Sequence, residues 1–196
     1  MIKRILLNTI KMLGERKFLN INNHSQNYEK LIKQISDKKT FKIKSDYSDE
    51  YFHIMILLFK ITSIKKIDGI NIFIDEANNH NKMFIIKKIN KKVYNQFIKL
   101  NNTEVFFHYE LLVNIIDHDL QPKFELLSKK DTEEFYNSYK VKSTEIPKML
   151  STDKIARYYN AKPEEVFRII RPSITTGYTV FYRKVVKSDS SLLFIK

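Results

Sequence analysis

Hydrophobic residues near the N-terminus repeat with the spacing of a helix. Residues 2–13 follow the i, i+3, i+4, i+7 pattern, which predicts a helix with one buried stripe. The positions of this stripe are Ile2, Ile5, Leu6, Thr9, Ile10 and Leu13. A second helix is predicted after Ser25, a residue type that caps helices, and its apolar face consists of Tyr28, Leu31, Ile32 and Ile35.

Apolar runs in the first half of the chain predict strands. The run YFHIMILLFKI at 51–61 is continuous and short, which favours a central strand. Shorter runs at 83–86 and 104–109 predict two further strands, and the polar segment 37–50 predicts a loop. The segment 67–79 fits both periods, because its isoleucines alternate as in a strand while its apolar residues also fall at helical spacing. Periodicity alone leaves that segment open.

The pattern changes near residue 120, where we expect a boundary between two domains. Pro122 follows the last apolar run of the first half, and the segment around it is polar. The predicted domains are 1–120 and 121–196. No internal repeat or low-complexity linker separates them.

The second half predicts helices followed by a strand pair. Ser128 and Asp131 fit a capping box, and the helix that follows is expected to bury Phe135, Tyr136 and Tyr139. Residues 151–159 predict a short helix with a Ser/Thr cap, and another helix is predicted to begin at Pro163. Two strands then follow, joined by SITTG, in which Gly177 supplies a left-handed turn position. Helices and strands in both halves predict a mixed α+β fold.

The formal net charge of +13 is concentrated in one half of the chain. Residues 1–100 hold 20 Lys/Arg and 9 Asp/Glu, a net charge of +11, whereas residues 101–196 hold 15 and 13, a net charge of +2. A basic balance indicates a polyanionic partner for the first half, usually nucleic acid. The alternative is solvated surface, since the abundance of Lys, Asn and Ile is also typical of AT-rich codons.

The residue types present argue against an enzyme. The chain has no cysteine, which excludes disulfides, thiol catalysis and thiolate metal sites. Its 3 glycines are too few for a glycine-rich phosphate cradle. Only His118 has carboxylates beside it, and on an extended chain Asp117 and Asp119 would face away from it. A nuclease built on these residues is a remote alternative, and no catalytic residue, metal or cofactor is predicted.

The sequence carries no sign of a membrane or export signal. The first 17 residues are interrupted by Lys3, Arg4 and Lys11 and lack a small-residue cleavage site. The apolar run at 53–61 is too short to cross a bilayer. We therefore expect an intracellular protein with no membrane partner.

Lysine clusters in the first half provide candidate DNA contacts. Lys87, Lys88, Lys91 and Lys92 follow the end of a predicted strand, where a loop could present four ammonium groups together. Such groups contact phosphates without reading sequence, and their binding is sensitive to salt. The alternative is a solvated loop. The other lysine clusters are Lys38, Lys39, Lys42 and Lys44, and the pair Lys65 and Lys66.

The hairpin sequence RIIRPSITTGYTVFYR, residues 168–183, places Arg168, Arg171 and Arg183 beside an apolar core. Acidic neighbours and the nearly neutral charge of this half argue against phosphate binding. Arginine together with tyrosine is typical of protein interfaces. We therefore expect a protein-docking hairpin whose arginines pair with acids on a partner or brace the domain internally.

Several motifs occur in order in the second half of the chain. They are DHDLQP at 117–122, IPK at 146–148, ARY at 156–158, IIRPS at 169–173 and YR at 182–183. In this order, over residues 111–186, they resemble the fifth subunit common to the eukaryotic nuclear RNA polymerases, which has an archaeal counterpart without the N-terminal half. The N-terminal half resembles the eukaryotic family more loosely, through NTIKMLGERKF at 8–18.

The resemblance implies a non-catalytic RNA polymerase subunit with two α/β domains. The N-terminal domain would hold a small sheet flanked by helices, with 67–78 as a helix, and form part of the lower jaw beside downstream double-stranded DNA. The C-terminal domain would dock on the largest subunit and assist assembly with the other subunits. The docking candidates are His118, Pro122, Pro147, Arg157, Tyr158, Arg168, Arg171, Pro172, Tyr178, Tyr182 and Arg183.

Departures from the family pattern indicate a divergent member. Lys17 stands where the family has glycine, and 90–93, Asn-Lys-Lys-Val, stand where it has a Thr-Pro-Ser-Ala-like loop. A large DNA virus that encodes its own polymerase is the predicted source, and a eukaryote with an AT-rich genome is the alternative. The location would be the host cytoplasm and virion in the first case, and the nucleus in the second. The alternative function is a free-standing basic nucleic-acid-binding protein.

Overall fold

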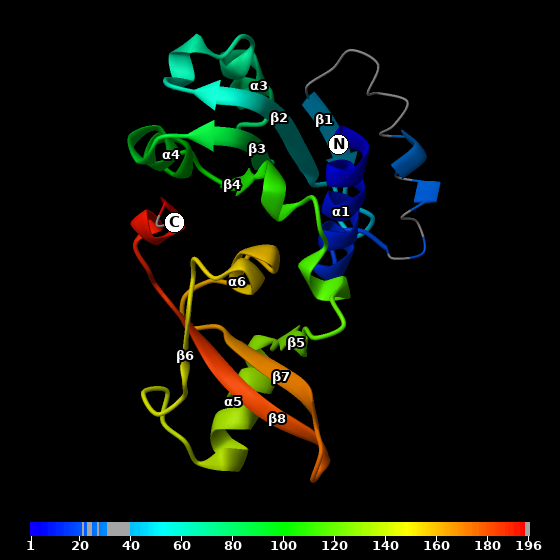
Figure 1. Ribbon diagram of the computed structural model, residues 1–196, viewed down its shortest axis with the longest axis vertical. Helices are drawn as coiled ribbons and strands as arrows, with labels where there is room; N and C mark the ends of the chain where they lie inside the picture. The colour runs from blue at the N-terminus through cyan, green and yellow to red at the C-terminus, as the bar shows by residue number, and fades with distance from the viewer. Residues whose placement is uncertain (21, 23–24, 27, 31–39, 195–196) are drawn as a thin grey trace. The chain divides into compact units, whose positions relative to one another are not determined.

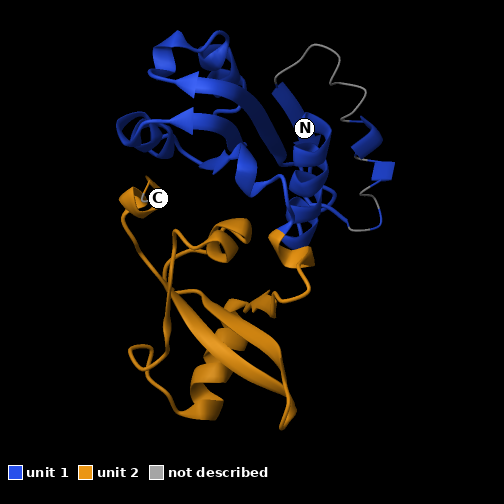
Figure 2. Cartoon of the chain, viewed as in Figure 1, with its two compact units in different colours: residues 1–114 blue, residues 115–196 orange. Residues whose placement is uncertain are grey.

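Helices and strands are divided between two units, residues 1–114 and 115–196 (Figure 2). The computed structural model describes residues 1–20, 22, 25–26, 28–30 and 40–194. Each unit contains helices and one mixed sheet, so the predicted α+β class is confirmed. The division falls shortly before the domain boundary that the sequence predicts near residue 120.

Unit 1 is organised by a sheet that, in the described part of the chain, has the strand order β1-β2-β3-β4 (Figure 1). β1 pairs with β2 in the antiparallel sense, whereas β2, β3 and β4 are parallel, so the chain crosses over between them through α3 and α4. The elements are α1 (Ile2–Glu15), β1 (Thr40–Lys44), β2 (Tyr51–Ile61), the 3-10 turn η2 (Ile64–Lys66), α3 (Ile70–Glu76), β3 (Asn81–Ile89), α4 (Lys91–Ile98), β4 (Thr103–Phe107) and η3 (His108–Glu110).

The hydrophobic pattern explains most of unit 1. α1 buries Ile5, Leu6 and Leu13 completely, as its helical spacing predicts, and each such side chain stabilises the fold by roughly 1.5–3 kcal/mol. Ile54 on β2 and Phe84 on β3 are also fully buried, at the centre of the continuous apolar runs. The predicted helix at 2–13 and the central strand at 51–61 are therefore confirmed.

In unit 1 the structure corrects one prediction from the sequence and decides another that the pattern left open. The segment 37–50, predicted to be a loop, contains strand β1, because Phe41 and Ile43 are buried and alternate with exposed lysines. Within the segment 67–79, Ile70–Glu76 form helix α3, which begins after Gly69 at a φ of 74°. The family resemblance had implied that helix. Of the predicted second helix, Leu31, Ile32 and Ile35 lie outside the described residues.

Unit 2 contains a second sheet, with the strand order β5-β7-β8-β6 among the residues that the structure describes. β7 pairs with β5 and β8 in the antiparallel sense, and β8 is parallel to β6. A small core beneath this sheet is formed by Met149, Ile155, Phe167, Ile169 and Val185. The elements are η4 (Ile115–Asp117), β5 (Lys123–Leu126), α5 (Lys129–Tyr139), β6 (Lys148–Leu150), α6 (Lys154–Tyr158), β7 (Val166–Ser173), β8 (Gly177–Val186) and η5 (Ser190–Phe194).

The helix caps of unit 2 follow the sequence in one case and depart from it in another. Ser128 caps α5 and exchanges hydrogen bonds with Asp131, which confirms the predicted capping box. α5 buries Phe135, but Tyr139 is 60% exposed, so its predicted burial is wrong. α6 is capped by Asp153, whose carboxylate accepts a hydrogen bond from the Ile155 amide, instead of the expected Ser or Thr.

The helix predicted at Pro163 does not form. Glu164 has a positive φ of 77°. Its amide donates to the carbonyl of Val185, so the segment pairs with the end of β8 and leads into β7. The two strands after it are confirmed, and Gly177 closes their turn with a φ of 74°.

Candidate functional site

The parallel strands of unit 1 bring lysines from separate parts of the sequence to one edge of the sheet. The carboxyl ends of β2 and β3 lie together because the strands are parallel and in register (Figure 1). η2 follows the end of β2, α4 follows the end of β3, and these two helices contact each other. We call the seven exposed lysines on these four elements the lysine edge: Lys60, Lys65, Lys66, Lys87, Lys88, Lys91 and Lys92.

Local sequence explains why the strand lysines face solvent. The buried run of β3 stops after Ile86, so that Lys87 and Lys88 are exposed before Ile89 is buried again. A register shift between Leu57 and Lys60 on β2 places Lys60 opposite Lys88. Like charges directly opposite each other in a sheet are destabilising. The structure therefore accepts an electrostatic cost at this edge.

The lysines of α4 meet a similar cost. Lys91 and Lys92 occupy the first turn of α4, after the N-cap Asn90, and no acidic residue lies in that turn. The positive end of a helix dipole favours anions and disfavours cations. Only Asn90 separates β3 from α4, so the expected loop is a strand end joined to a helix start. Such an edge suits the phosphates of a nucleic acid backbone.

The described lysines of the other predicted cluster, Lys42 and Lys44, lie on β1 and are not part of this edge. Lys38 and Lys39 lie outside the described residues. The ammonium of Lys42 lies 4.3 Å from the centre of the Tyr51 ring, and Lys44 pairs with Asp49 at 2.8 Å. The hydrogen bond to Asp49 raises the pKa of Lys44. Lys42 and Lys44 thus have partners on β2 and in the turn between β1 and β2.

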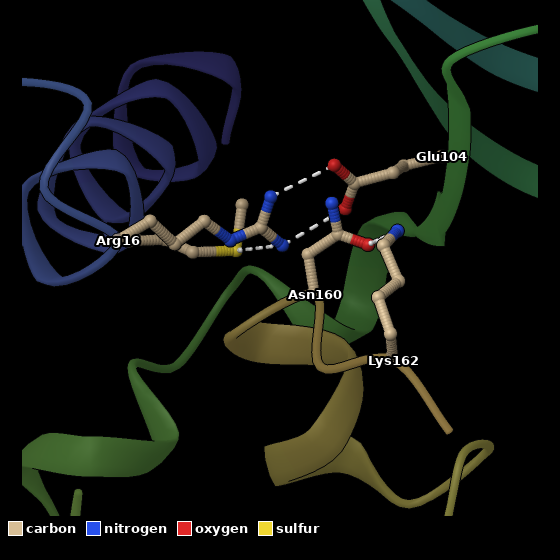
Figure 3. A network of polar contacts seen from close by, with 5 residues as sticks. Arg16, Glu104, Asn160 and Lys162 are labelled. Atoms are coloured by element: carbon tan, nitrogen blue, oxygen red, sulfur yellow. Dashed lines mark hydrogen bonds and ion pairs between the residues drawn. The ribbon is translucent and has the colours of Figure 1, made fainter. Parts of the chain in front are cut away.

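A polar contact inside unit 1 joins the end of α1 to β4, the strand beside β3 in the sheet. Arg16, at the end of α1, donates through both terminal nitrogens to the carboxylate of Glu104 on β4, at 2.8 Å each, and one nitrogen also reaches the sulfur of Met12 (Figure 3). A bidentate pair of this kind is directional and shielded from solvent. Lys17 follows with a φ of 58°, a left-handed conformation that glycine adopts more readily than lysine.

Two buried side chains, His53 and Lys82, lie at the amino ends of β2 and β3, which are the ends away from the lysine edge. Lys82 is 2% exposed, and its ammonium donates to the carbonyls of Ala77, Asn78 and His80 in the turn between α3 and β3. Burial lowers the pKa of Lys82. His53 is 3% exposed and stacks on His80 with ring centres 5.5 Å apart. Burial, followed by the charges of Lys42, His80 and Lys82, lowers the pKa of His53 to about 4.

The turn around His118 shows no catalytic arrangement. His118 is exposed, and its Nδ1 accepts a hydrogen bond from the Leu120 amide at 3.2 Å. The described residues contain no group of three or more His, Cys, Asp or Glu side chains that could hold a metal ion. In the same part of the chain, no helix is long and apolar enough to cross a membrane.

In unit 2 the β7–β8 hairpin divides its arginines between different environments. Arg168 lies 3.7 Å from the carboxylate of Glu125 on β5, within its own sheet. Arg171 is exposed and packs over the ring of Phe181, 4.2 Å from its centre. Arg183 is exposed and pairs in register with the buried Phe167. The hypothesis that arginines brace the domain internally fits Arg168.

The tyrosines of the hairpin are divided in the same way. Tyr182 stacks on Phe135 of α5 with ring centres 4.1 Å apart. Burial and hydrogen bonding with Tyr139 raise the pKa of Tyr182. Tyr178, near the turn, is 72% exposed. Tyr182 therefore joins helix to sheet, whereas Tyr178 faces solvent.

The tip of the hairpin is apolar and exposed, and the sequence pattern had not singled out all of it. Ile174 is fully exposed, and Val180 and Phe181 are each 39% exposed. Pro172 is exposed on the facing strand, opposite Tyr178. An isoleucine inside a turn was the available signal for this surface. We define Pro172, Ile174, Tyr178, Val180 and Phe181 as the hairpin tip.

The remaining docking candidates lie elsewhere in unit 2. Pro122 is half-buried ahead of β5, and Pro147 is exposed and accepts a backbone hydrogen bond from Lys184. Arg157 is half-buried on α6. Tyr158 is 4% exposed and contacts Tyr159 edge to face. Of these four residues, Pro147 is exposed, Pro122 and Arg157 are half-buried, and Tyr158 is buried.

Comparison with known proteins gives a consistent set of relatives. The family model for the C-terminal domain of RNA polymerase Rpb5 matches residues 113–185. A "DNA-directed RNA polymerase subunit 5" of Acanthamoeba polyphaga mimivirus is 34% identical over 191 residues, covering 94% of this chain and 92% of the relative. A subunit of RNA polymerases I, II and III from Dictyostelium discoideum is 42% identical over 83 residues, covering 42% of each chain. The archaeal subunit Rpo5 of Archaeoglobus fulgidus is 43% identical over 70 residues, covering 36% of this chain and 92% of that protein.

Proposed function

The chain belongs to the Rpb5 family of non-catalytic subunits of DNA-directed RNA polymerase, and on this premise we propose that its two units have different tasks within such an enzyme. Unit 1 forms part of the lower jaw and contacts downstream double-stranded DNA through the lysine edge. Unit 2 docks on the largest polymerase subunit through the β7–β8 hairpin and assists assembly with the other subunits. The mimivirus relative supports a role in a virus-encoded polymerase. For such a polymerase, we propose the host cytoplasm and the virion as the location of the chain.

The lysine edge is the observation that carries the DNA contact. Seven exposed ammonium groups collect where two parallel strands end. Two features oppose stability there: Lys60 lies opposite Lys88, and Lys91 and Lys92 stand at the positive end of α4. A surface that keeps an electrostatic cost of this kind supports binding of a polyanion. The contact would be independent of DNA sequence and weaken with added salt.

The hairpin tip supports the docking role of unit 2. Ile174, Tyr178 and Phe181 expose apolar area at one end of the sheet, and Arg171 lies over the Phe181 ring. Exposed aromatic and apolar groups with an arginine are the usual anchors of protein interfaces. In contrast, Arg168 and Tyr182 hold the hairpin to β5 and α5.

A second candidate function follows from the lysine edge alone. A free-standing basic nucleic-acid-binding protein would bind DNA or RNA without partners and with a steep salt dependence. A jaw surface needs to add only a few phosphate contacts to those of a larger enzyme. Binding by the isolated chain that disappears at physiological salt would therefore favour the polymerase subunit.

Affinity purification of the tagged chain from its native source tests the proposed function. The purification should use moderate salt and nuclease, followed by mass spectrometry. We expect stoichiometric recovery of the two largest polymerase subunits. Recovery of the chain alone, or only with nucleic acid, would favour the free-standing binder instead.

The DNA contact can be tested within the assembled polymerase. Replacement of Lys87, Lys88, Lys91 and Lys92 by glutamine should reduce cross-linking to downstream DNA. It should also lower the salt dependence of binding by about one unit of slope for each phosphate that is no longer neutralised. A matched control changes four exposed lysines of unit 2 to glutamine: Lys129, Lys140, Lys148 and Lys162. Equal effects of the two sets would refute a specific role for the lysine edge.

The docking role can be tested with exposed residues of the hairpin. Arg171→Glu and Tyr178→Ala should weaken recovery of the largest subunit while the chain stays folded by circular dichroism. Tyr47→Ala in unit 1 is the matched control, because Tyr47 is 65% exposed and lies far from the hairpin in sequence. Tyr182→Ala is a poor test, since loss of its stacking on Phe135 would disturb the fold. Normal assembly of both hairpin variants would refute docking through this surface.

A further inference from the structure

A pocket of about 430 Å³ opens on unit 2 at one end of its small core. Phe124, Met149 and Ile155 contribute its apolar lining, and Met149 and Ile155 are at most 5% exposed. Arg183 and Lys154 also line the pocket, and both are exposed. The cavity is thus apolar where it meets the core and cationic where it meets solvent, the usual composition of a binding pocket.

The two cationic groups at this pocket have no anionic partner among the described residues of unit 2. Neither Arg183 nor Lys154 forms an ion pair with a carboxylate in the part of the chain that the structure describes. The neighbouring Asp153 accepts the Ile155 amide at 2.8 Å, so its carboxylate serves as the cap of α6. The pocket therefore presents positive charge beside an apolar opening, which is complementary to a carboxylate beside an apolar side chain.

We propose that this pocket receives a segment of a partner protein in which a bulky apolar side chain stands next to one or two acidic residues. The apolar side chain would fill the space over Phe124, Met149 and Ile155. An acidic neighbour would pair with Arg183, whose guanidinium matches a carboxylate with two parallel hydrogen bonds. The inference rests on the proposed docking role of unit 2 and assigns it a second contact, separate from the hairpin tip.

The geometry favours a protein segment over nucleic acid. Backbone recognition of nucleic acid uses rows of cations, whereas this pocket has two cationic side chains and the carboxylate of Asp153 beside them. A protein segment with an apolar side chain and an acidic neighbour would contact both the apolar lining and the cationic side chains of the pocket.

Photo-cross-linking in the assembled polymerase tests the proposal. The photoreactive residue p-benzoylphenylalanine would replace Gln121, which lines the pocket, in the full-length tagged chain. The same replacement of Ser138, an exposed residue of α5, serves as the control position. After illumination, mass spectrometry identifies the cross-linked peptide. We expect a peptide from a large polymerase subunit, with an apolar residue next to Asp or Glu, at the Gln121 position and not at Ser138.

Charge reversal then tests the ion pair. Arg183→Glu should lower the cross-link yield at least about fivefold, as the loss of a paired interface charge does. Lys187→Glu, an equal charge change at an exposed residue outside the pocket, should leave the yield unchanged. Reversing the acidic residue of the identified peptide to arginine should restore the cross-link to the Arg183→Glu chain.

The outcomes separate this inference from the proposed function. Suppose that the chain co-purifies with the large subunits but gives no cross-link at Gln121, or gives one to nucleic acid or to a segment without an acidic residue. This result refutes the pocket assignment and leaves the subunit role intact. A cross-link that Arg183→Glu does not weaken refutes it as well. Failure to co-purify refutes the proposed function. If the chain does not co-purify, the cross-link at Gln121 still tests the pocket. A cross-linked peptide with an apolar residue next to an acidic one, whose yield falls in Arg183→Glu, supports the pocket assignment, and any other cross-linking result refutes it.

Discussion

Acidification should destabilise unit 1 through one imidazole, that of His53. Its side chain is 3% exposed and lies between aromatic rings on β2, α3 and the turn before β3. Lys42 and Lys82 add positive charge nearby, and burial is the main cause of its low pKa of about 4. An unfolded chain would protonate His53 at its ordinary pKa of 6.5.

The sign of the effect follows from proton counting. Between pH 6.5 and about 4 the unfolded chain binds a proton at His53 that the folded chain does not, so acid favours unfolding. The stability present above pH 6.5 is lost as the pH falls towards 4. Linkage of these two pKa values gives a loss of about 2 kcal/mol at pH 5 and about 3 kcal/mol at pH 4.

Urea unfolding measured by circular dichroism at several pH values would test this magnitude. The chain has no tryptophan, so dichroism is more informative than intrinsic fluorescence. His53→Phe keeps an aromatic ring in the cluster and removes the titration. We expect the wild type to lose about 3 kcal/mol more than this variant between pH 7 and pH 4. His118→Gln, at an exposed histidine, should behave as the wild type.

A direct measurement of the imidazole would refute the reasoning most simply. Proton NMR can follow the histidine resonances with pH, and the signal missing from His53→Phe identifies His53. Titration of that signal near 6.5, or parallel loss of stability in wild type and His53→Phe, would show that burial does not suppress protonation.

Three further substitutions should change stability by amounts that urea unfolding can resolve. Lys82→Met removes the ammonium that binds three carbonyls in the turn between α3 and β3, and should cost about 2–3 kcal/mol, because the buried carbonyl of Ala77 loses its charged donor. A loss below about 0.5 kcal/mol would contradict this. Ser128→Ala should cost about 1 kcal/mol through loss of the α5 cap, whereas Ser138→Ala in the same helix should be nearly neutral. Phe135→Ala should cost about 3 kcal/mol, since its ring packs on Tyr182, and a loss under about 1 kcal/mol would show that α5 is held in another way.

Local sequence signals were sufficient where the structure is decided locally. The stripe of α1, the capping box before α5 and the Gly177 turn each depend on residues a few positions apart, and each forms as predicted. The helix expected at Pro163 failed for the opposite reason. Its proline and glutamates favour a helix start, but pairing of Glu164 with Val185 of β8 decides the backbone. Similarly, the lysines of β1 concealed its alternating buried Phe41 and Ile43.

The candidate sites were predictable to a similar extent. Lys87, Lys88, Lys91 and Lys92 are close in sequence, so their clustering could be inferred directly. Lys60 joins them only through the parallel register of β2 and β3 and the shift after Leu57, which no local pattern reveals. In the hairpin, sequence could not decide which side chains face outward, because packing of α5 on one face of the sheet determines it.

The arrangement of the second sheet has a mechanical consequence for any load on the hairpin tip. β7 and β8 run from the buried core at Val166 and Val185 to the exposed turn at Gly177, with β5 along one side and β6 along the other. Backbone hydrogen bonds in a sheet lie roughly across the strands. Tension along the strands would therefore shear both flanking ladders at once, whereas a sideways force would open them bond by bond. A partner that pulls along the strand axis meets the stiff direction of this unit.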